Sequence, residues 1–265
     1  MTINYDMTNE EYHLSPAISS SAVKTVATKS VAHWKYGQRQ HKAAFDMGTA
    51  VHTLVLEPHN AHTVWCGPET RRGKEWKERK AEADESGCIL LPEAEYAQAR
   101  DMAEAVRANK EAAALLGGDL VCEASVFGHD EASGLDLRCR PDGWRKDIDM
   151  LVDLKTTIDA SPAGFAKQVA NFGYHMQDYF YRRVMALEGV EIDRFAFIAV
   201  EKEPPYATGV YELDWASLEE GEAAVKAALE QIKHAQTTGK FGTGHEGLQT
   251  IQIPRWAFQY TKLAT

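Results

Sequence analysis

Two short segments of the chain contain residues whose types and spacing suit metal-dependent hydrolysis. The first contains Pro141 and Asp142, and the second contains Asp153 and Lys155, with a short polar stretch between them. If the two segments form one hairpin, Asp142 lies almost opposite Asp153, and Asp153 and Lys155 share a face ~7 Å apart. Converging carboxylates of this kind bind Mg²⁺ or Mn²⁺, which can activate water beside a phosphodiester.

The same short patterns also occur on protein surfaces, where a Pro-Asp turn and an Asp-x-Lys strand have no catalytic role. Asp153, however, lies in the otherwise apolar segment 150–154. A carboxylate buried in such a strand costs free energy unless it is paired or bound to a metal. The hairpin therefore favours a metal site, and residues elsewhere in the chain must decide its function.

Residues outside the hairpin add to this pattern. His52 follows Gly48 on a predicted helix, although a lone histidine on an apolar helix is more often part of the core. Gln177 and Tyr181 are four positions apart, so they share one face of another predicted helix. On their own these two residues indicate only an amphipathic helix surface.

Taken in order along the chain, these residues resemble the RecB-type branch of the PD-(D/E)xK nucleases. The order is GxxxH, an acidic residue, Pro-Asp, DxK and QxxxY. The similarity covers about residues 9–200 and is to the nuclease-domain family of RecE (exonuclease VIII), with lambda exonuclease more distantly similar. The segments that carry it are residues 9–13, 18–21, 48–58, 138–142, 153–157 and 174–177.

The resemblance implies an α/β fold with a restriction-endonuclease-like core, in which helices flank a mixed central sheet. It implies Mg²⁺-dependent degradation of linear double-stranded DNA from 5′ ends, which leaves 3′ single strands for annealing and recombination; Mn²⁺ is the expected substitute. It also implies a ring-shaped homo-oligomer, a trimer or a tetramer, and a RecT-like single-strand annealing protein as partner. The implied setting is a phage or prophage gene expressed in a bacterial host.

The resemblance also implies roles for individual residues of a catalytic metal site. Asp142 and Asp153 match the metal-binding acids, and Lys155 matches the catalytic lysine. His52 matches the helix residue that completes the metal site. Gln177 matches the glutamine near the attacking water or the scissile phosphate.

Other matched residues have roles that the resemblance leaves less defined. Tyr181 is the helical companion of Gln177 and is grouped with the substrate-binding residues. Glu123 matches an acid on the strand before the hairpin, which either supports the metal ligands or pairs with a basic group. Arg140 is expected to reach a phosphate, whereas a catalytic role for His175 is disfavoured.

Ser19 and Ser21 match a helix start that grips the terminal 5′ phosphate in lambda exonuclease. Free backbone N–H groups at a helix N-terminus attract phosphate, which agrees with this role. Ordinary N-capping by serine explains the same residues equally well.

The bulk composition is that of a globular enzyme. The 265 residues are 44% hydrophobic and 26% charged, which is ordinary for this class. No apolar run is long enough to cross a membrane and no secretory signal is visible, so we expect a cytoplasmic protein. The four cysteines lack CxxC spacing, which argues against a zinc or iron–sulfur site. The net charge of −10 means that DNA binding requires a locally basic channel.

The apolar pattern predicts a single α/β domain over residues 1–265, with an all-helical part at about 1–60 and the nuclease core at about 88–240. Expected strands are 63–66, 88–91, 122–128, 135–144, 150–156, 194–200 and 208–212. Expected helices are two short ones over 19–40, then 43–56, 71–84, 92–116, a pair over 161–187, and 216–237. The basic segment 71–80 either lines a DNA channel or, as is commoner, forms a solvated helix.

Two other functions stay open on the sequence alone. An endonuclease or a flap nuclease would use the same metal site on different substrates. A non-catalytic scaffold that binds DNA ends is disfavoured, because Asp142, Asp153 and Lys155 are all present.

Overall fold

Helices and strands alternate along the part of the chain that the structure, a computed structural model, describes: residues 2–38 and 43–258. The helices are α1 (Asn9–Leu14), α2 (Ser20–Thr28), α3 (Val31–Tyr36), α4 (Ala43–Leu56), α5 (Gly73–Glu85), α6 (Glu93–Ala108), α7 (Lys110–Leu115), α8 (Pro162–Phe172), α9 (Tyr174–Leu187) and α10 (Trp215–Thr238). The strands are β1 (Thr2–Asn4), β2 (Ile18–Ser19), β3 (Val64–Cys66), β4 (Ile89–Leu91), β5 (Leu120–Cys122), β6 (Ser125–Asp130), β7 (Leu135–Cys139), β8 (Gly143–Arg145), β9 (Met150–Thr157), β10 (Arg194–Glu201) and β11 (Thr208–Tyr211). Short 3₁₀ helices are η1 (Pro58–Thr63), η2 (Lys146–Ile148) and η3 (Arg255–Ala257).

The strands form a mixed central sheet and a second, antiparallel-dominated sheet beside it. The central sheet has the order β11-β10-β9-β8-β5, in which β9 and β10 are parallel and the other pairs are antiparallel. The second sheet has the order β1-β6-β7-β2. A small parallel pair, β3 and β4, lies apart from both. The expected α/β fold with a mixed sheet flanked by helices is confirmed.

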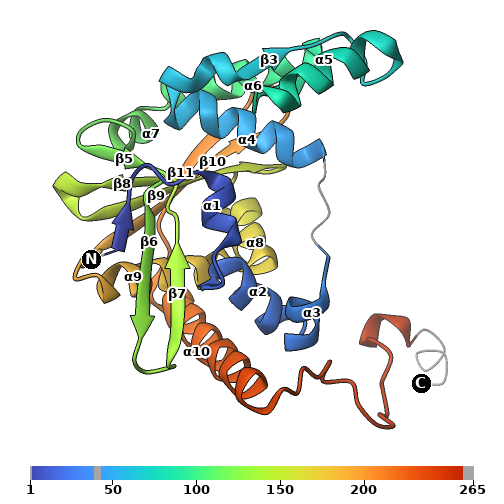
Figure 1. Cartoon of the computed structure of the whole chain (residues 1–265), viewed down its shortest axis with the longest axis vertical. Helices are drawn as coiled ribbons and strands as arrows, with labels where there is room; N and C mark the ends of the chain where they lie inside the picture. Colours follow the sequence, from blue (N-terminus) through green and yellow to red (C-terminus); the bar gives the residue numbers. More distant parts are fainter. Residues whose placement is uncertain (1, 39–42, 259–265) are drawn as a thin grey trace, which may run out of the picture.

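The central sheet lies between two layers of helices (Figure 1). On one face α4 and α6 pack over Val152 and Leu154 of β9. On the other face α2, α8, α9 and α10 cover Leu151 and the neighbouring aromatic residues. Because side chains alternate along a strand, Asp153 and Lys155 point to the same side as Leu151, toward α9. The sheet therefore places these two residues under a helix.

Two expected strands, 122–128 and 135–144, are each broken in the structure. The first divides at Glu123, whose φ of 55° lies in the left-handed region, and the second divides between Cys139 and Gly143. At both breaks the chain leaves one sheet and enters the other, since β5 and β8 belong to the central sheet and β6 and β7 to the second. The two predictions were therefore wrong in continuity, although they located the residues correctly.

Other predictions of helices need smaller corrections. The expected helix 92–116 ends at Ala108, because the Asn109 side chain accepts a hydrogen bond from Ala112 N and begins α7. The N-terminal part is not all-helical, since β1 and β2 form the two edges of the second sheet. Helix α1, which begins with a capping box between Thr8 and Glu11, was not among the expected elements.

Most of the basic segment belongs to α5, where two of its lysines pair with acids one turn away, whereas Arg71 precedes the helix and pairs with Glu95 of α6 and Asp46 of α4. Lys74 pairs with Glu78, and Lys80 pairs with Asp84. These contacts fit the solvated-helix interpretation. Within the described residues, no helix combines the length and the apolar character that crossing a membrane requires.

Candidate active site

The predicted hairpin is present with the predicted register. Gly143 of β8 lies opposite Val152 of β9, so the preceding Asp142 lies beside Asp153. The Asp142 carboxylate is fixed in place because its Oδ2 accepts a hydrogen bond from Leu154 N at 2.8 Å. The side chain of Asp142 thus lies at the end of the β8–β9 pairing.

His52 reaches the same point from α4. Its Nε2 lies 2.7 Å from the Leu154 carbonyl oxygen, and its Nδ1 lies 3.5 Å from Asp142 Oδ2. A carbonyl oxygen only accepts hydrogen bonds, so Nε2 carries a proton, and Nδ1 is the nitrogen that can present a lone pair to a metal ion. A carbonyl that orients an imidazole in this way is the usual support of a metal-binding histidine.

Glu123 completes a group of three metal-ligand types. One donor atom each from His52, Glu123 and Asp142 lie within 4.8 Å of one another. The left-handed backbone of Glu123, at the break between β5 and β6, turns its side chain toward this group. Burial and the neighbouring Asp142 carboxylate raise the pKa of Glu123 to about 8, against the opposing effect of Arg140. Two carboxylates close to an imidazole nitrogen are a suitable set of ligands for a divalent cation.

This group differs in one member from the predicted ligand set of His52, Asp142 and Asp153. Asp153 is nearby but is 1% exposed, and its carboxylate is already engaged. It forms an ion pair with Lys155 and accepts a hydrogen bond from Gln177 Nε2. The metal role predicted for Asp153 stays a prediction.

Asp153, Lys155 and Gln177 form a polar cluster between β9 and α9. Burial and the nearby Asp142 raise the pKa of Asp153, whereas Lys155 opposes this. Burial acts to lower the pKa of Lys155, but the Asp153 and Asp142 carboxylates outweigh it and raise that pKa. The lysine therefore remains a charged donor next to the candidate metal site.

Lys24 of α2 is a member of this cluster that the sequence analysis missed. Its Nζ donates a hydrogen bond to Gln177 Oε1 at 3.3 Å. Lys155 and Lys24 lie near the Tyr174 ring, with ammonium-to-centroid distances of 4.9 Å and 5.7 Å. Burial and the Lys155 charge lower the pKa of Lys24 to about 8. The available signal was a single cation among the small and apolar residues of α2.

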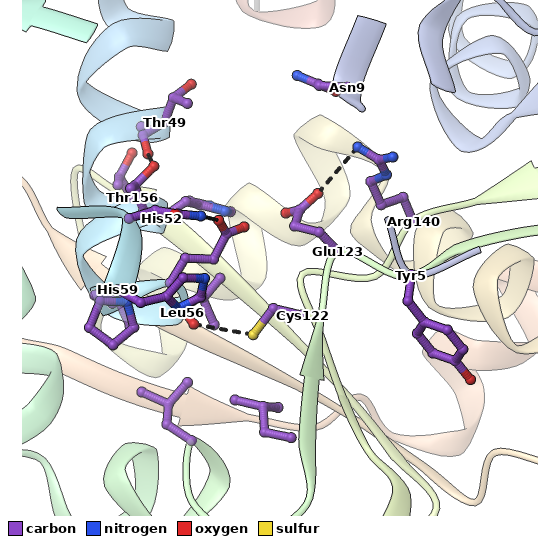
Figure 2. Close-up of a pocket in the computed structure, with 18 of the residues that line it drawn as sticks. Tyr5, Asn9, Thr49, His52, Leu56, His59, Cys122, Glu123, Arg140 and Thr156 are labelled. Atoms are coloured by element: carbon purple, nitrogen blue, oxygen red, sulfur yellow. Dashed lines mark hydrogen bonds and ion pairs between the residues drawn. The ribbon is translucent and has the colours of Figure 1, made fainter. Parts of the chain in front are cut away.

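A cleft of about 1260 Å³ is lined by His52 and Glu123, two of the three candidate ligands. Figure 2 shows His52 on the α4 side of this cleft, with Glu123 and Arg140 opposite. Asp6 and Glu57 also line it. Three acids and the cations Arg140 and Lys202 thus line the cleft, and a bound metal ion would add positive charge that favours the approach of a phosphate.

Ser19 acts as the N-cap of α2, as one of its two interpretations predicted. Its Oγ accepts a hydrogen bond from Ala22 N at 3.4 Å and lies 2.9 Å from Ser21 Oγ. Ser21 is exposed on the first turn of the helix. Binding of a 5′ phosphate by these two serines stays a prediction.

The Arg140 guanidinium forms hydrogen bonds and an ion pair with other residues of the protein. It is 8% exposed, and its Nη2 donates to the Met7 carbonyl at 2.7 Å and to Ser125 Oγ at 2.6 Å. Its Nη1 faces Glu123 at 3.9 Å. The expected phosphate contact would have to use Nη1 and remains a prediction.

The structure places the last two matched residues on α9, and neither belongs to the group of three candidate ligands. Tyr181 is half-buried, with its ring centroid 6.1 Å from that of Phe195. His175 Nδ1 lies 3.4 Å from the Val169 carbonyl oxygen, which gives it a role in joining α8 and α9. Direct substrate contact by Tyr181 stays a prediction, as does the disfavoured catalytic role of His175.

Comparison with known families gives a match over most of the chain. Residues 17–252 match the model of a family described as a PDDEXK-like domain of unknown function, DUF3799. The chain belongs to this family. The PDDEXK-like character covers the hairpin, α4 and α9, and hence every element of the candidate site. No curated protein is similar enough in sequence to count as a match.

Solved structures provide a comparison at the level of the fold. A candidate exonuclease from Eubacterium rectale is similar with a TM-score of 0.63 at 15% identity, over 95% of this chain and 97% of that chain. A phage-related exonuclease from Haemophilus somnus 129PT has a TM-score of 0.38 at 14% identity, over 86% of this chain and 99% of that chain. The first of these similarities shows a shared fold.

Proposed function

We propose that the protein is a Mg²⁺-dependent exodeoxyribonuclease that resects linear double-stranded DNA from 5′ ends and leaves 3′ single strands. The observation that carries this proposal is the convergence of donor atoms of His52, Glu123 and Asp142 beside the Asp153–Lys155 pair, at a point where His52 and Glu123 line a cleft. The family's PDDEXK-like character and the fold shared with a candidate exonuclease support it. Manganese is expected to substitute, because one ligand is an imidazole.

The donor set suits a divalent cation, and His52, Glu123 and Asp142 would hold it. Such an ion supplies an activated water and neutralises charge that develops on the phosphate oxygens. Lys155 is held by Asp153 with its ammonium charged, so it can donate a hydrogen bond to a phosphate oxygen or orient the water. Gln177 fixes the other side of Asp153 and thereby keeps Lys155 in place.

The 5′→3′ direction rests on the resemblance to the RecE family and on α2. Ser19 and Ser21 at the start of this helix offer hydroxyls and a helix N-terminus to a terminal phosphate. The same helix contributes Lys24 to the cluster beside β9. We include in the proposal a ring-shaped homo-oligomer, a RecT-like annealing partner and a phage or prophage origin, all on the basis of the resemblance.

A digestion time course on end-labelled DNA tests the proposal. Linear duplexes labelled at either the 5′ or the 3′ end, together with a closed circular duplex, are incubated with Mg²⁺ or Mn²⁺. The expected result is early release of the 5′ label, retention of the 3′ label and an intact circle. Cutting of the circle would establish an endonuclease instead, and end binding without any cleavage would indicate a scaffold.

A further inference from the structure

Lys24 is a cation that has no ion pair of its own with a carboxylate among the described residues. Its Nζ has the neutral Gln177 Oε1 as hydrogen-bond partner at 3.3 Å, and no carboxylate of the described residues pairs with it. An ammonium carries three N–H donors, so most of its donor capacity is unused by these contacts. A partly buried cation without a counter-ion is unfavourable.

Two further features make the position of Lys24 unfavourable for a cation. Lys155 lies beside the same Tyr174 ring and already forms the ion pair with Asp153, so Lys24 adds a second ammonium group next to the first. The stem of Lys24 also crosses the start of α9, where a Cβ at Gly173 would lie 3.2 Å from Lys24 Cδ. The partial positive charge of a helix N-terminus repels an ammonium.

The side chain nevertheless remains accessible, because Lys24 is only half-buried. An anion that entered beside β9 and α9 would meet the charge of Lys24 next to the catalytic cluster. A phosphate group is the anion that the proposed substrate brings to this position.

We propose that Lys24 is a phosphate-binding residue that contacts the backbone of the bound DNA strand on the α9 side of the metal site. This inference rests on the proposed function, since it takes DNA as the substrate. It adds a second cation to Lys155 and assigns to α2 a contact with the strand that is independent of Ser19 and Ser21.

Salt dependence of DNA binding tests the contact directly. Binding of a fluorescent linear duplex is measured at several salt concentrations with Ca²⁺ in place of Mg²⁺, after gels confirm that the DNA stays intact. Each lost phosphate contact lowers the slope of log Kd against log salt by about 1. Lys24→Met is therefore expected to weaken binding and lower the slope by about 1, whereas Lys24→Arg keeps the slope.

Lys29→Met is the matched control, because it removes the same charge from an exposed position at the end of the same helix. It is expected to leave the slope unchanged. An unchanged slope in Lys24→Met, an equal loss in Lys29→Met, or loss of the slope in Lys24→Arg as well would overturn the assignment.

Thermal unfolding without DNA separates this role from a structural one. Removing an ammonium that has no ion pair of its own is expected to leave the Tm of Lys24→Met equal to or above that of the unmodified protein. A Tm of Lys24→Met markedly below that of the unmodified protein would instead mean that Lys24 stabilises the fold. If Lys24→Met does not fold, Lys24→Gln takes its place in the binding measurements. Cleavage of DNA by the unmodified protein is measured separately. If the unmodified protein cleaves DNA but Lys24→Met has an unchanged salt slope, only the Lys24 contact is refuted. If the unmodified protein neither cleaves nor binds DNA, the proposed function is refuted.

Discussion

Glu123→Gln is expected to stabilise the metal-free protein and to weaken its response to Mn²⁺. Burial and the adjacent Asp142 raise the pKa of Glu123 to about 8 from an ordinary value of 4.5. A carboxyl group with a raised pKa binds its proton more tightly in the folded state than in the unfolded state. The contribution of Glu123 to stability is therefore most favourable below about pH 4.5 and is lost as the pH rises toward 8. Glu123→Gln has no titrating carboxyl group at this position, so it does not lose stability in this way as the pH rises.

The size of the effect follows from the shift and from the exposure of the side chain. At pH 7 the full shift would correspond to a loss of ~3 kcal/mol in the free energy of unfolding. The Glu123 side chain is 37% exposed, so water screens the interaction and the net loss is nearer ~1–2 kcal/mol. For a chain of this size the variant should then melt roughly 2–8 °C higher than the unmodified protein.

Thermal unfolding in EDTA at about pH 5 and about pH 8 measures this difference. The Tm advantage of the variant should be small at the lower pH and larger at the higher pH, because only the unmodified protein carries the titrating carboxyl group. Glu230→Gln, which alters an exposed carboxyl group on α10, is the control and should show no advantage. Adding Mn²⁺ should raise the Tm of the unmodified protein by the linkage of binding to folding and raise that of Glu123→Gln much less.

Two results would refute this reasoning. A lower Tm for Glu123→Gln in EDTA would mean that the carboxyl group stabilises the metal-free fold, for example through Arg140. Equal stabilisation of both proteins by Mn²⁺ would mean that Glu123 does not hold the ion.

Three further substitutions probe the site and the core. Asp153→Asn is expected to reduce cleavage of end-labelled linear DNA by about 100-fold or more. It should also lower the Tm, because Lys155 loses its buried counter-ion. His52→Gln is expected to raise the Mn²⁺ concentration needed for half-maximal cleavage by about 10- to 100-fold, which an activity titration would show. Phe197→Ala, in the fully buried core, should lower the free energy of unfolding in urea by about 3–5 kcal/mol without altering the Mn²⁺ requirement; an altered requirement would show that the core and the site are coupled.

The hairpin and its register could be predicted from sequence because local rules determine them. Alternation along β9 assigns Asp153 and Lys155 to one face, and a turn of the observed length brings Asp142 beside them. These relations depend on neighbours within one hairpin, which the apolar pattern reveals. Gln177 was linked to the site only by the resemblance, and the structure places it on α9 against Asp153.

The position of Glu123 could not be predicted in the same way. A run of strand-forming residues gives no sign that one residue adopts a left-handed conformation and transfers the chain between sheets. The place of Lys24 in the site could not be predicted for a related reason. Its partner Gln177 is 153 positions away, and their contact depends on how α2 packs on α9. Contacts of this kind are set by tertiary packing.

The chain crosses between its two sheets at Glu123 and again just before Asp142, and the crossings are adjacent. Glu123 N lies 3.4 Å from the Asp142 carbonyl oxygen, so the two acids sit where the sheets join. His52 belongs to α4, which packs on the central sheet. A change in the angle between the two sheets would therefore alter the distances between the donor atoms of His52, Glu123 and Asp142. The affinity for the metal ion would then depend on that angle. By reciprocity, ion binding must restrain the β6–β7 hairpin to the same extent, so slower hydrogen exchange at the far end of that hairpin would record occupancy of the site.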